Sequence, residues 1–205
     1  MKWLQHIWQG KGSWRDARWV AIDCETNGLN AQQDALLSVA WVPIEPPFIP
    51  LAKSGYALIQ HQQPLNQSAV VHQLSQHQLA GGLALPEALL QLKEATDGAI
   101  LIAHHAQFDR TVLQRAMQQC NINWQPQGWY DTLRAEQRVL ERGSVALKQD
   151  SLTLARCRSR YGLLPFHGHH ARSDAIACAE LFLAQTYVAQ GRKPLTLNAV
   201  LARGR

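Results

Sequence analysis

The sequence predicts an α/β domain in which a mixed β-sheet is covered by α-helices. Three early segments have the composition of strands and are separated by turns, which is typical of antiparallel pairing. A later run, residues 99–103 (Ala-Ile-Leu-Ile-Ala), is short and wholly apolar, as in a strand that is buried on both faces. Helical patterns lie on both sides of this run. Strands that come first, followed by helices alternating with a buried strand, indicate a mixed sheet with helical cover.

The first half of the chain supplies the early strands. We expect them at residues 18–23, 36–42 and 56–59. Prolines interrupt the pattern before the third strand, at Pro43, Pro46, Pro47 and Pro50. Residues 1–18 are rich in Trp and basic groups, and we interpret them as an N-terminal helix whose aromatic side chains pack on the core. Because Trp and Arg can also stack on bases and hold phosphates, nucleic-acid contact is the alternative for this segment.

The second half of the chain is predicted to be largely helical. Ser75 is placed to cap a short helix that ends at Leu79. Longer helices are expected where apolar residues recur at intervals of three and four, over residues 86–95, 109–118, 132–142 and 171–189. Asp131 is expected to cap the helix 132–142, and Ser151 is expected to cap another helix that ends at Arg160.

Composition sets broad limits on function. The chain has 205 residues, 46% of them hydrophobic, so one domain with a substantial core is expected. The net charge of +5 weakly favours an anionic partner. The cysteines form no Cys-x-x-Cys pair and the chain opens without a secretory pattern, so we expect reduced thiols and a cytoplasmic protein. No apolar run is long enough to cross a bilayer, so we expect no membrane span.

Two carboxylates at the end of the first strand are the main chemical feature. Asp23 and Glu25 are two residues apart, so their side chains share one face of an extended strand. Neighbouring carboxylates repel each other unless a shared proton, a basic group or a divalent metal relieves the repulsion. An isolated Asp-x-Glu would more simply be an acidic strand end before a turn. The metal interpretation gains support from Asp109 and Asp174, because their segments can reach the same place.

Two other kinds of active site fit the sequence less well. Histidines could supply nitrogen ligands to zinc, at positions His104, His105, His167, His169 and His170. Their spacing matches no common zinc motif, and a site dominated by carboxylates suits Mg²⁺ or Mn²⁺ better. A Ser-His-Asp hydrolase is disfavoured because the sequence has no Gly-x-Ser-x-Gly elbow.

Three motifs, in this order, resemble the exonuclease motifs of the DEDDh superfamily. They are Asp-x-Glu-Thr-x-Gly-Leu from Asp23, His-x-Ala-x-Phe-Asp from His104, and His-x-Ala-x-x-Asp-Ala from His169. The superfamily includes the proofreading epsilon subunit of bacterial DNA polymerase III, ribonuclease T and oligoribonuclease. The resemblance extends over residues 19–184. It implies a ribonuclease H-like fold and removal of nucleoside monophosphates in the 3'-to-5' direction.

The resemblance also implies a division of the chain and a metal site. Residues 19–190 would form the exonuclease domain, between an N-terminal helical extension, 1–18, and a short C-terminal tail, 191–205. The carboxylates would bind two divalent ions, Mg²⁺ or Mn²⁺, which can activate a water and stabilise the leaving oxygen. Asp23, Glu25 and Asp174 would hold the ion that carries the attacking water. Asp23 would also contact the second ion, to which Asp109 would bind directly or through water.

The general base is expected among the histidines before the last helix. His169 lies five residues before Asp174, which is the position of the general base in the family, and an imidazole can accept a proton near neutral pH. A sister family has a tyrosine four residues before, where this chain has His170. Spacing alone separates the two histidines, and we predict that His169 is the base.

Substrate contacts are also carried over from the resemblance. The positions that match are Thr26, Gly28, Leu29, Phe108, His72 and His105. The first three would hold the terminal nucleotide and Phe108 would pack against the adjoining base or sugar, whereas His72 is expected to be structural, with a substrate contact as the alternative. The sequence departs from the family at Asn27, where Thr is usual, at His105, where Asn is usual, and at Arg172, where a Leu-like residue is common. None of these changes removes a metal ligand.

The leading hypothesis is a metal-dependent 3'-5' exonuclease that acts on single-stranded 3' ends, with DNA favoured over RNA. An RNA exonuclease like ribonuclease T or oligoribonuclease is one alternative. A non-catalytic nucleic-acid-binding module is another, although all five catalytic positions are filled. The short segment after the last helix does not support association with a polymerase, and the motifs do not decide between monomer and dimer. A basic run is expected to be mainly a solvated helix face, with a phosphate path as the alternative, and comprises Arg134, Arg138, Arg142, Lys148, Arg156, Arg158 and Arg160.

Overall fold

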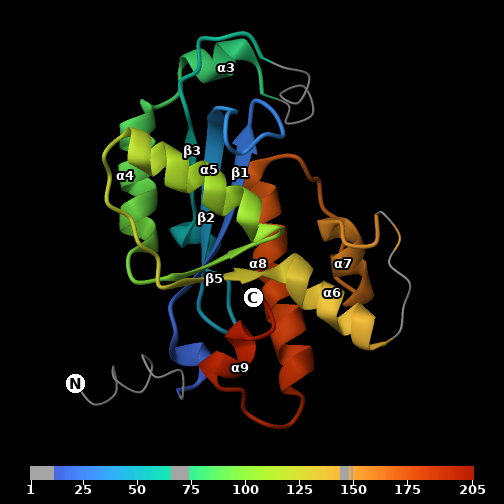
Figure 1. The fold of residues 1–205 in the computed structure, drawn as a ribbon. Coiled ribbons are helices and arrows are strands. Elements are labelled where there is room, and N and C mark those ends of the chain that lie inside the picture. The colour runs from blue at the N-terminus through green and yellow to red at the C-terminus, as the bar shows by residue number, and fades with distance from the viewer. Residues whose placement is uncertain (1–11, 66–73, 144–147, 149) are drawn as a thin grey trace, which may run out of the picture.

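The computed structural model describes residues 12–65, 74–143, 148 and 150–205, and helices cover both faces of its five-stranded sheet (Figure 1). The strands lie in the order β3-β2-β1-β4-β5. Their bounds are Trp19–Thr26 (β1), Leu36–Ile44 (β2), Gly55–Leu58 (β3), Ile100–Ala103 (β4) and Gly128–Asp131 (β5). β2 is antiparallel to both β1 and β3, while β4 is parallel to both β1 and β5. The expected mixed sheet with an antiparallel beginning is confirmed.

The helices follow the predicted order, with two short 3-10 turns in addition. The 3-10 turns are η1 (Trp14–Asp16) and η2 (Leu51–Lys53). The α-helices are α3 (Gln76–Ala80), α4 (Leu85–Thr96), α5 (Ala106–Gln119), α6 (Thr132–Arg142), α7 (Leu154–Arg160), α8 (Ala171–Gln190) and α9 (Leu197–Leu201). Ser75 and Asp131 cap α3 and α6 with their side chains, as predicted. None of the helices in the described part of the chain has the length and apolarity needed to span a membrane.

The alternation of side chains along β1 divides the core into two layers. Val20 and Ile22 face one layer, which they share with apolar residues of α4 and α5. Trp19 and Ala21 face the other layer, where the Trp19 ring lies 4.7 Å from the ring of Phe182 in α8. Because side chains two residues apart share a face, the next two positions on the second layer's side are Asp23 and Glu25.

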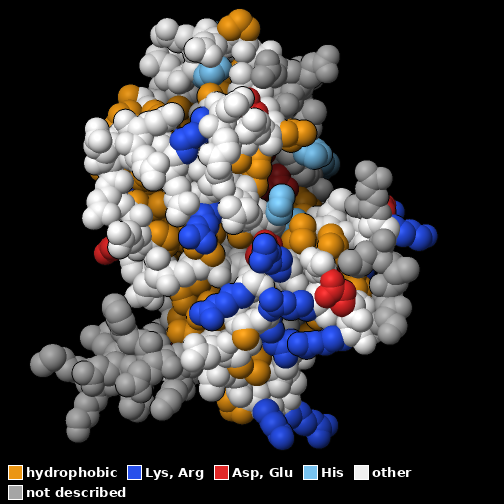
Figure 2. All heavy atoms as spheres, viewed as in Figure 1, with side chains coloured by type: hydrophobic (Ala, Val, Ile, Leu, Met, Phe, Trp, Pro, Cys, Tyr) orange, Lys and Arg blue, Asp and Glu red, His pale blue; other side chains and the backbone are white. Residues whose placement is uncertain are grey.

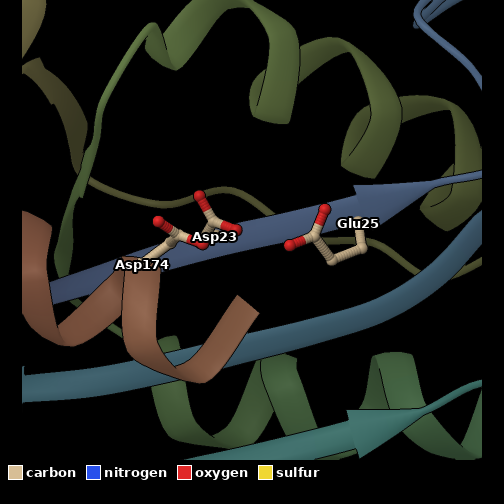
Figure 3. A group of neighbouring side chains, drawn as sticks. All are labelled: Asp23, Glu25 and Asp174. Atoms are coloured by element: carbon tan, nitrogen blue, oxygen red, sulfur yellow. The ribbon is translucent and has the colours of Figure 1, made fainter. Parts of the chain in front are cut away.

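Small residues bring α8 close to the sheet. Ala171 and Ala175 are fully buried in the layer beneath Trp19, and α8 packs against both β1 and β2. An alanine adds little width between a helix and a sheet, so the first turns of α8 approach the end of β1. Asp174 lies in this part of α8, next to the strand that carries the other two acids (Figure 3).

Four details differ from the sequence-based expectation. β5 was not predicted, because its four residues, Gly-Trp-Tyr-Asp, are too few to show a strand period. The five-residue α9 lies in the expected tail and is also new. α5 begins at Ala106 rather than at Asp109, and Thr153, not Ser151, caps α7. Local pairing and capping contacts decide such boundaries more than propensity does.

The described part of the N-terminal segment packs with the C-terminal one. Trp14 is buried and contacts the rings of Phe182 and Tyr187 edge-on. Ser13 forms an isolated bridge with Thr196, just before α9. Residues 12–16 and 196–201 therefore close the same end of the second core layer. The helix expected over residues 1–18 lies mostly outside the described residues, apart from the 3-10 turn η1.

The basic run contains arginines with different surroundings. Arg158 is buried, and its guanidinium donates to the Glu180 carboxylate at 2.6 Å and to two backbone carbonyls, which holds α7 against α8. Arg160 pairs with the buried Glu136 at 3.3 Å. These two arginines stabilise the fold. Figure 2 shows other Lys and Arg side chains gathered on one surface, over β5, α6 and the C-terminal residues.

Candidate active site

Three carboxylates meet where the end of β1 lies beside the first turns of α8. Asp23, Glu25 and Asp174 each offer an oxygen, and these oxygens all lie within 4.8 Å of one another (Figure 3). Glu25 is buried, while Asp23 and Asp174 are partly exposed, so the cluster opens to solvent on one side. The structure therefore brings together three of the four predicted metal ligands.

Backbone contacts hold the Asp174 carboxylate in position. The backbone N–H of His170 donates to Asp174 Oδ2 at 2.9 Å across the start of α8. Burial raises the pKa of Asp174, the bond from His170 lowers it, and the charge of Glu25 raises it again. The net direction is upward, which reflects a carboxylate held among other acids.

Asp23 lies at the centre of the acidic cluster. Burial raises its pKa well above the ordinary value, and the charges of Asp109, Asp174 and Glu25 raise it further. Ionising all of these groups is therefore unfavourable without a counter-charge. A hard divalent cation supplies that charge and prefers carboxylate oxygens, so the donor set fits such an ion.

Asp109 lies on the opposite side of β1 from α8, in the first turn of α5. Its Oδ1 accepts a hydrogen bond from the backbone N–H of Cys24 at 3.1 Å, which ties α5 to the strand between the two acids of β1. Its side chain is almost fully buried, and burial is the main cause that raises its pKa to about 7. Asp109 is not part of the three-carboxylate cluster, although its charge acts on Asp23.

The two candidate bases have different surroundings. The His170 side chain makes two contacts. As the N-cap of α8, its Nδ1 accepts a hydrogen bond from the backbone N–H of Arg172. Its ring also stacks on the Tyr56 ring, with the centroids 5.1 Å apart and an angle of 20° between the ring planes. His169 is exposed and has a left-handed backbone with φ 66°. Its charge lowers the pKa of Asp174, so the imidazole lies near that carboxylate. His167 is exposed in the same loop.

Tyr56 belongs to the site although no sequence motif indicates it. It lies on the edge strand β3 and stacks on His170. Burial raises the pKa of Tyr56, and the charge of the nearby Glu25 raises it further. The stack braces the loop that carries His169 and the N-terminus of α8. No local motif marks it, because β3 and α8 meet only through the fold.

Asp131 organises the opposite edge of the site. Its carboxylate accepts the backbone N–H groups of His105 and Ala106 at 3.1 and 3.0 Å, and also those of Leu133 and Arg134 at 2.9 and 3.3 Å. It thus caps α5 as well as α6, whereas the sequence indicated only the cap of α6. The first turn of α5, which carries Asp109, is fixed in this way.

The surroundings of His104 and His105 indicate structural roles rather than metal binding. His104 donates through Nε2 to the Leu152 carbonyl at 2.7 Å and accepts through Nδ1 from Thr132 Oγ1 at 2.9 Å. Burial lowers its pKa, so it remains neutral and structural. His105 has a left-handed backbone with φ 72°, a conformation in which Asn and His are both enriched, and this explains why His can replace the usual Asn.

The predicted substrate positions lie at the end of β1 and beyond it. Thr26 is buried and donates through Oγ1 to the Gly28 carbonyl at 2.6 Å, so its hydroxyl shapes the turn. A Cβ on Gly28 would lie 2.3 Å from the Asp34 carboxylate, so a larger residue there would have to displace that side chain. Leu29 is 86% exposed and free to meet a ligand.

The other substrate positions are less uniform. Phe108 is half-buried and packs on the first core layer from α5. His72 lies outside the described residues. Of the departures from the family, Asn27 is buried and donates to the Pro64 carbonyl at 3.3 Å, while Arg172 is exposed and donates to Ser54 Oγ at 3.4 Å. Both side chains thus have contacts within the fold.

Comparisons with known proteins agree with the motifs. An exonuclease family model (RNase_T) matches residues 20–182. The chain is 27% identical to the DNA polymerase III PolC-type protein of Thermotoga petrophila over 83% of its own length and 12% of that protein, and 28% identical to ribonuclease T of Haemophilus ducreyi over 52% and 58% of the two chains. It therefore spans a small part of its PolC-type relatives.

Solved structures give the same fold. Exonuclease X, in complex with DNA that has a 5' overhang, matches with a TM-score of 0.69 at 18% identity, over 91% of this chain and 99% of that one. The predicted ribonuclease H-like fold is confirmed by this match. Exonucleases of this family depend on divalent metals, which agrees with the acidic cluster. The chain belongs to the RNase_T exonuclease family.

Proposed function

We propose that this protein is a metal-dependent 3'-5' exonuclease that releases nucleoside monophosphates from single-stranded ends. The observation that carries the proposal is the cluster of Asp23, Glu25 and Asp174, whose oxygens converge within 4.8 Å from a strand and a helix. Membership of the exonuclease family gives this cluster a chemistry, hydrolysis of a phosphodiester.

The residues of the site would divide the work. Asp23, Glu25 and Asp174 would hold one ion, and Asp23 and Asp109 a second, either Mg²⁺ or Mn²⁺. When bound, such ions activate the attacking water and stabilise the charge that develops on the leaving oxygen. His169 would accept the proton of the water, since its ring is exposed near Asp174.

The 3' end would lie over the turn that follows β1. Leu29 is exposed there and would pack on the terminal base, while the shape of the turn depends on Thr26 and Gly28. Phe108 and His105, on the first turn of α5, would flank the next nucleotide. In this arrangement the Asp109 carboxylate, one residue after Phe108, is adjacent to the phosphate that is cleaved.

We favour DNA over RNA as the substrate. Relatives named as DNA polymerase III PolC-type and the solved exonuclease X complex with DNA support this choice. The ribonuclease T relative makes an RNA exonuclease the alternative. Selection for or against a 2'-hydroxyl depends on the shape of the pocket that holds the terminal nucleotide.

The experiment is a cleavage assay with matched DNA and RNA oligonucleotides. With Mg²⁺ or Mn²⁺, a 5'-labelled strand should shorten stepwise and a 3'-labelled strand should release its label as a monophosphate in the first step. A 3'-phosphate-blocked strand is the matched control. Internal cuts, release from the 5' end, or tight binding without cleavage under either metal would contradict the proposal, and the last result would favour a binding module.

A further inference from the structure

A groove lies beside the candidate site, between α5 and β5. It has a volume of about 530 Å³ and is lined on the α5 side by Ala106, Gln107, Arg110 and Gln114. The opposite wall includes Trp129, Asp131 and Arg134. It belongs to the surface where Figure 2 shows Lys and Arg side chains gathered over β5, α6 and the C-terminal residues. None of the four carboxylates assigned to the metals lines it.

The groove is positively charged. Arg110 and Arg134 are both exposed, and Arg110 forms no ion pair with any residue in the described part of the chain. Arg134 lies 3.9 Å from Asp131, a distance at which the pairing is weak for an exposed guanidinium. The acidic side chain in the wall, Asp131, accepts four backbone N–H bonds that offset its charge. The two guanidinium groups are thus available to an anion.

Rigid aromatic rings form another part of the wall. Trp129 meets Trp124 edge to face at 6.1 Å and 88°, and both are half-buried against the first core layer. Trp124 is further held by a 2.9 Å hydrogen bond from its Nε1 to Thr96 Oγ1. Arginines beside fixed aromatic rings are the combination that holds phosphates and stacks bases of single-stranded nucleic acid. An acidic peptide would use the charge but gain little from the rings.

The groove reaches the start of α5, the helix that carries Asp109. Asp131 lines the groove and also binds the backbone of His105 and Ala106, and Asp109 follows one turn later on the same helix. The carboxyl ends of the parallel β-strands β1, β4 and β5 lie at one edge of the sheet. A single-stranded nucleic acid whose 3' end lies at the acids can therefore cross the start of α5 and enter the groove.

We infer that this groove binds the part of the single-stranded substrate that lies 5' of the cleavage site. Arg110 and Arg134 hold its phosphates, and Trp129 stacks on a base. The inference rests on the proposed function, because it takes the occupant of the groove to be the strand whose 3' end lies at the acids. The affinity of the protein for a single-stranded oligonucleotide should therefore increase once the oligonucleotide is long enough to reach the groove.

The test is binding of a fluorescent single-stranded oligonucleotide by anisotropy in the presence of EDTA, where no cleavage occurs. The double variant Arg110→Gln/Arg134→Gln should bind a long oligonucleotide at least about tenfold more weakly than wild type, with a salt dependence reduced by the loss of about two phosphate contacts. A dinucleotide should bind both proteins equally. The matched control is Arg192→Gln/Lys193→Gln, which removes the same charge from exposed positions outside the groove.

Equal affinities of the groove variant and the control would overturn the inference, as would an equal loss for the dinucleotide. Displacement of the oligonucleotide by polyglutamate at matched charge would overturn it in favour of an acidic peptide. Thermal unfolding verifies that each variant is folded, and the single variants Arg110→Gln and Arg134→Gln replace the double variant if it is not. Length-dependent binding without any cleavage in Mg²⁺ would instead contradict only the proposed function.

Discussion

Replacing Asp109 by Asn should stabilise the metal-free protein at pH 8 and leave its stability unchanged at low pH. The substitution keeps an oxygen that can accept the Cys24 N–H, so the link between α5 and β1 is preserved. It removes only the charge of a buried carboxyl group. The structure predicts the sign of the effect, because burial raises the pKa of Asp109 from 3.8 to about 7.

The magnitude follows from this difference in pKa. Well below pH 4 the carboxyl group is protonated in both the folded and the unfolded states, so it contributes nothing to the pH dependence. As the pH rises from about 4 to about 7, the unfolded chain loses the proton while the folded protein keeps it, and the free energy of unfolding falls. One pKa unit corresponds to about 1.4 kcal/mol, so the wild type loses roughly 4 kcal/mol that the Asn variant retains.

The assay is urea unfolding of both proteins in EDTA at several pH values. The urea unfolding curve of Asp109→Asn should coincide with that of wild type near pH 4. Above pH 7 its midpoint should lie at a higher urea concentration than the midpoint of wild type. Added Mg²⁺ should narrow the gap, because binding to the folded wild type offsets the buried charge. A variant that is less stable than wild type at pH 8, or a gap that does not change with pH, would refute the electrostatic account of Asp109.

Three other substitutions test separate parts of the account. His169→Ala should lower kcat by about 10²-fold or more in single-turnover cleavage, while His170→Ala should mainly lower stability through the lost cap, by about 1 kcal/mol; the reverse ranking would reassign the base. Leu29→Ala should raise KM about fivefold and leave the melting temperature unchanged, since Leu29 is 86% exposed; an unchanged KM would exclude its contact with the terminal base. Arg158→Ala should destabilise the fold by about 3 kcal/mol, because it removes a buried side chain and the donor to the Ala177 and Leu164 carbonyls, with normal activity per folded molecule; unchanged stability would contradict its structural role.

The acidic cluster could be predicted because each of its residues belongs to a short sequence motif, and several such motifs occur along the chain. The spacing of Asp23 and Glu25 fixes a shared face, and each remaining acid belongs to a motif next to a recognisable strand or helix. The structure brings three of these four acids within 4.8 Å and places Asp109 beside them through a backbone bond. The order of strands and helices supplied the rest of the prediction.

The parts that could not be predicted depend on contacts between distant segments. β5 is a four-residue strand that exists through its pairing with β4, and its last residue, Asp131, binds the N-terminus of α5. The stack of Tyr56 on His170 joins an edge strand to the last long helix. The groove likewise combines residues of α5 and β5. Sequence spacing within one element does not report such neighbours.

We propose that the acids of β1 and α8 make this chain a metal-dependent 3'-5' exonuclease. The most direct measurement compares wild type and Asp23→Asn on a 5'-labelled single-stranded oligonucleotide, with and without Mg²⁺ or Mn²⁺. Wild type with metal should give a ladder that shortens from the 3' end, and neither wild type in EDTA nor Asp23→Asn with metal should shorten the strand. Equal shortening by wild type and Asp23→Asn, or no shortening by wild type with either metal, would contradict the claim.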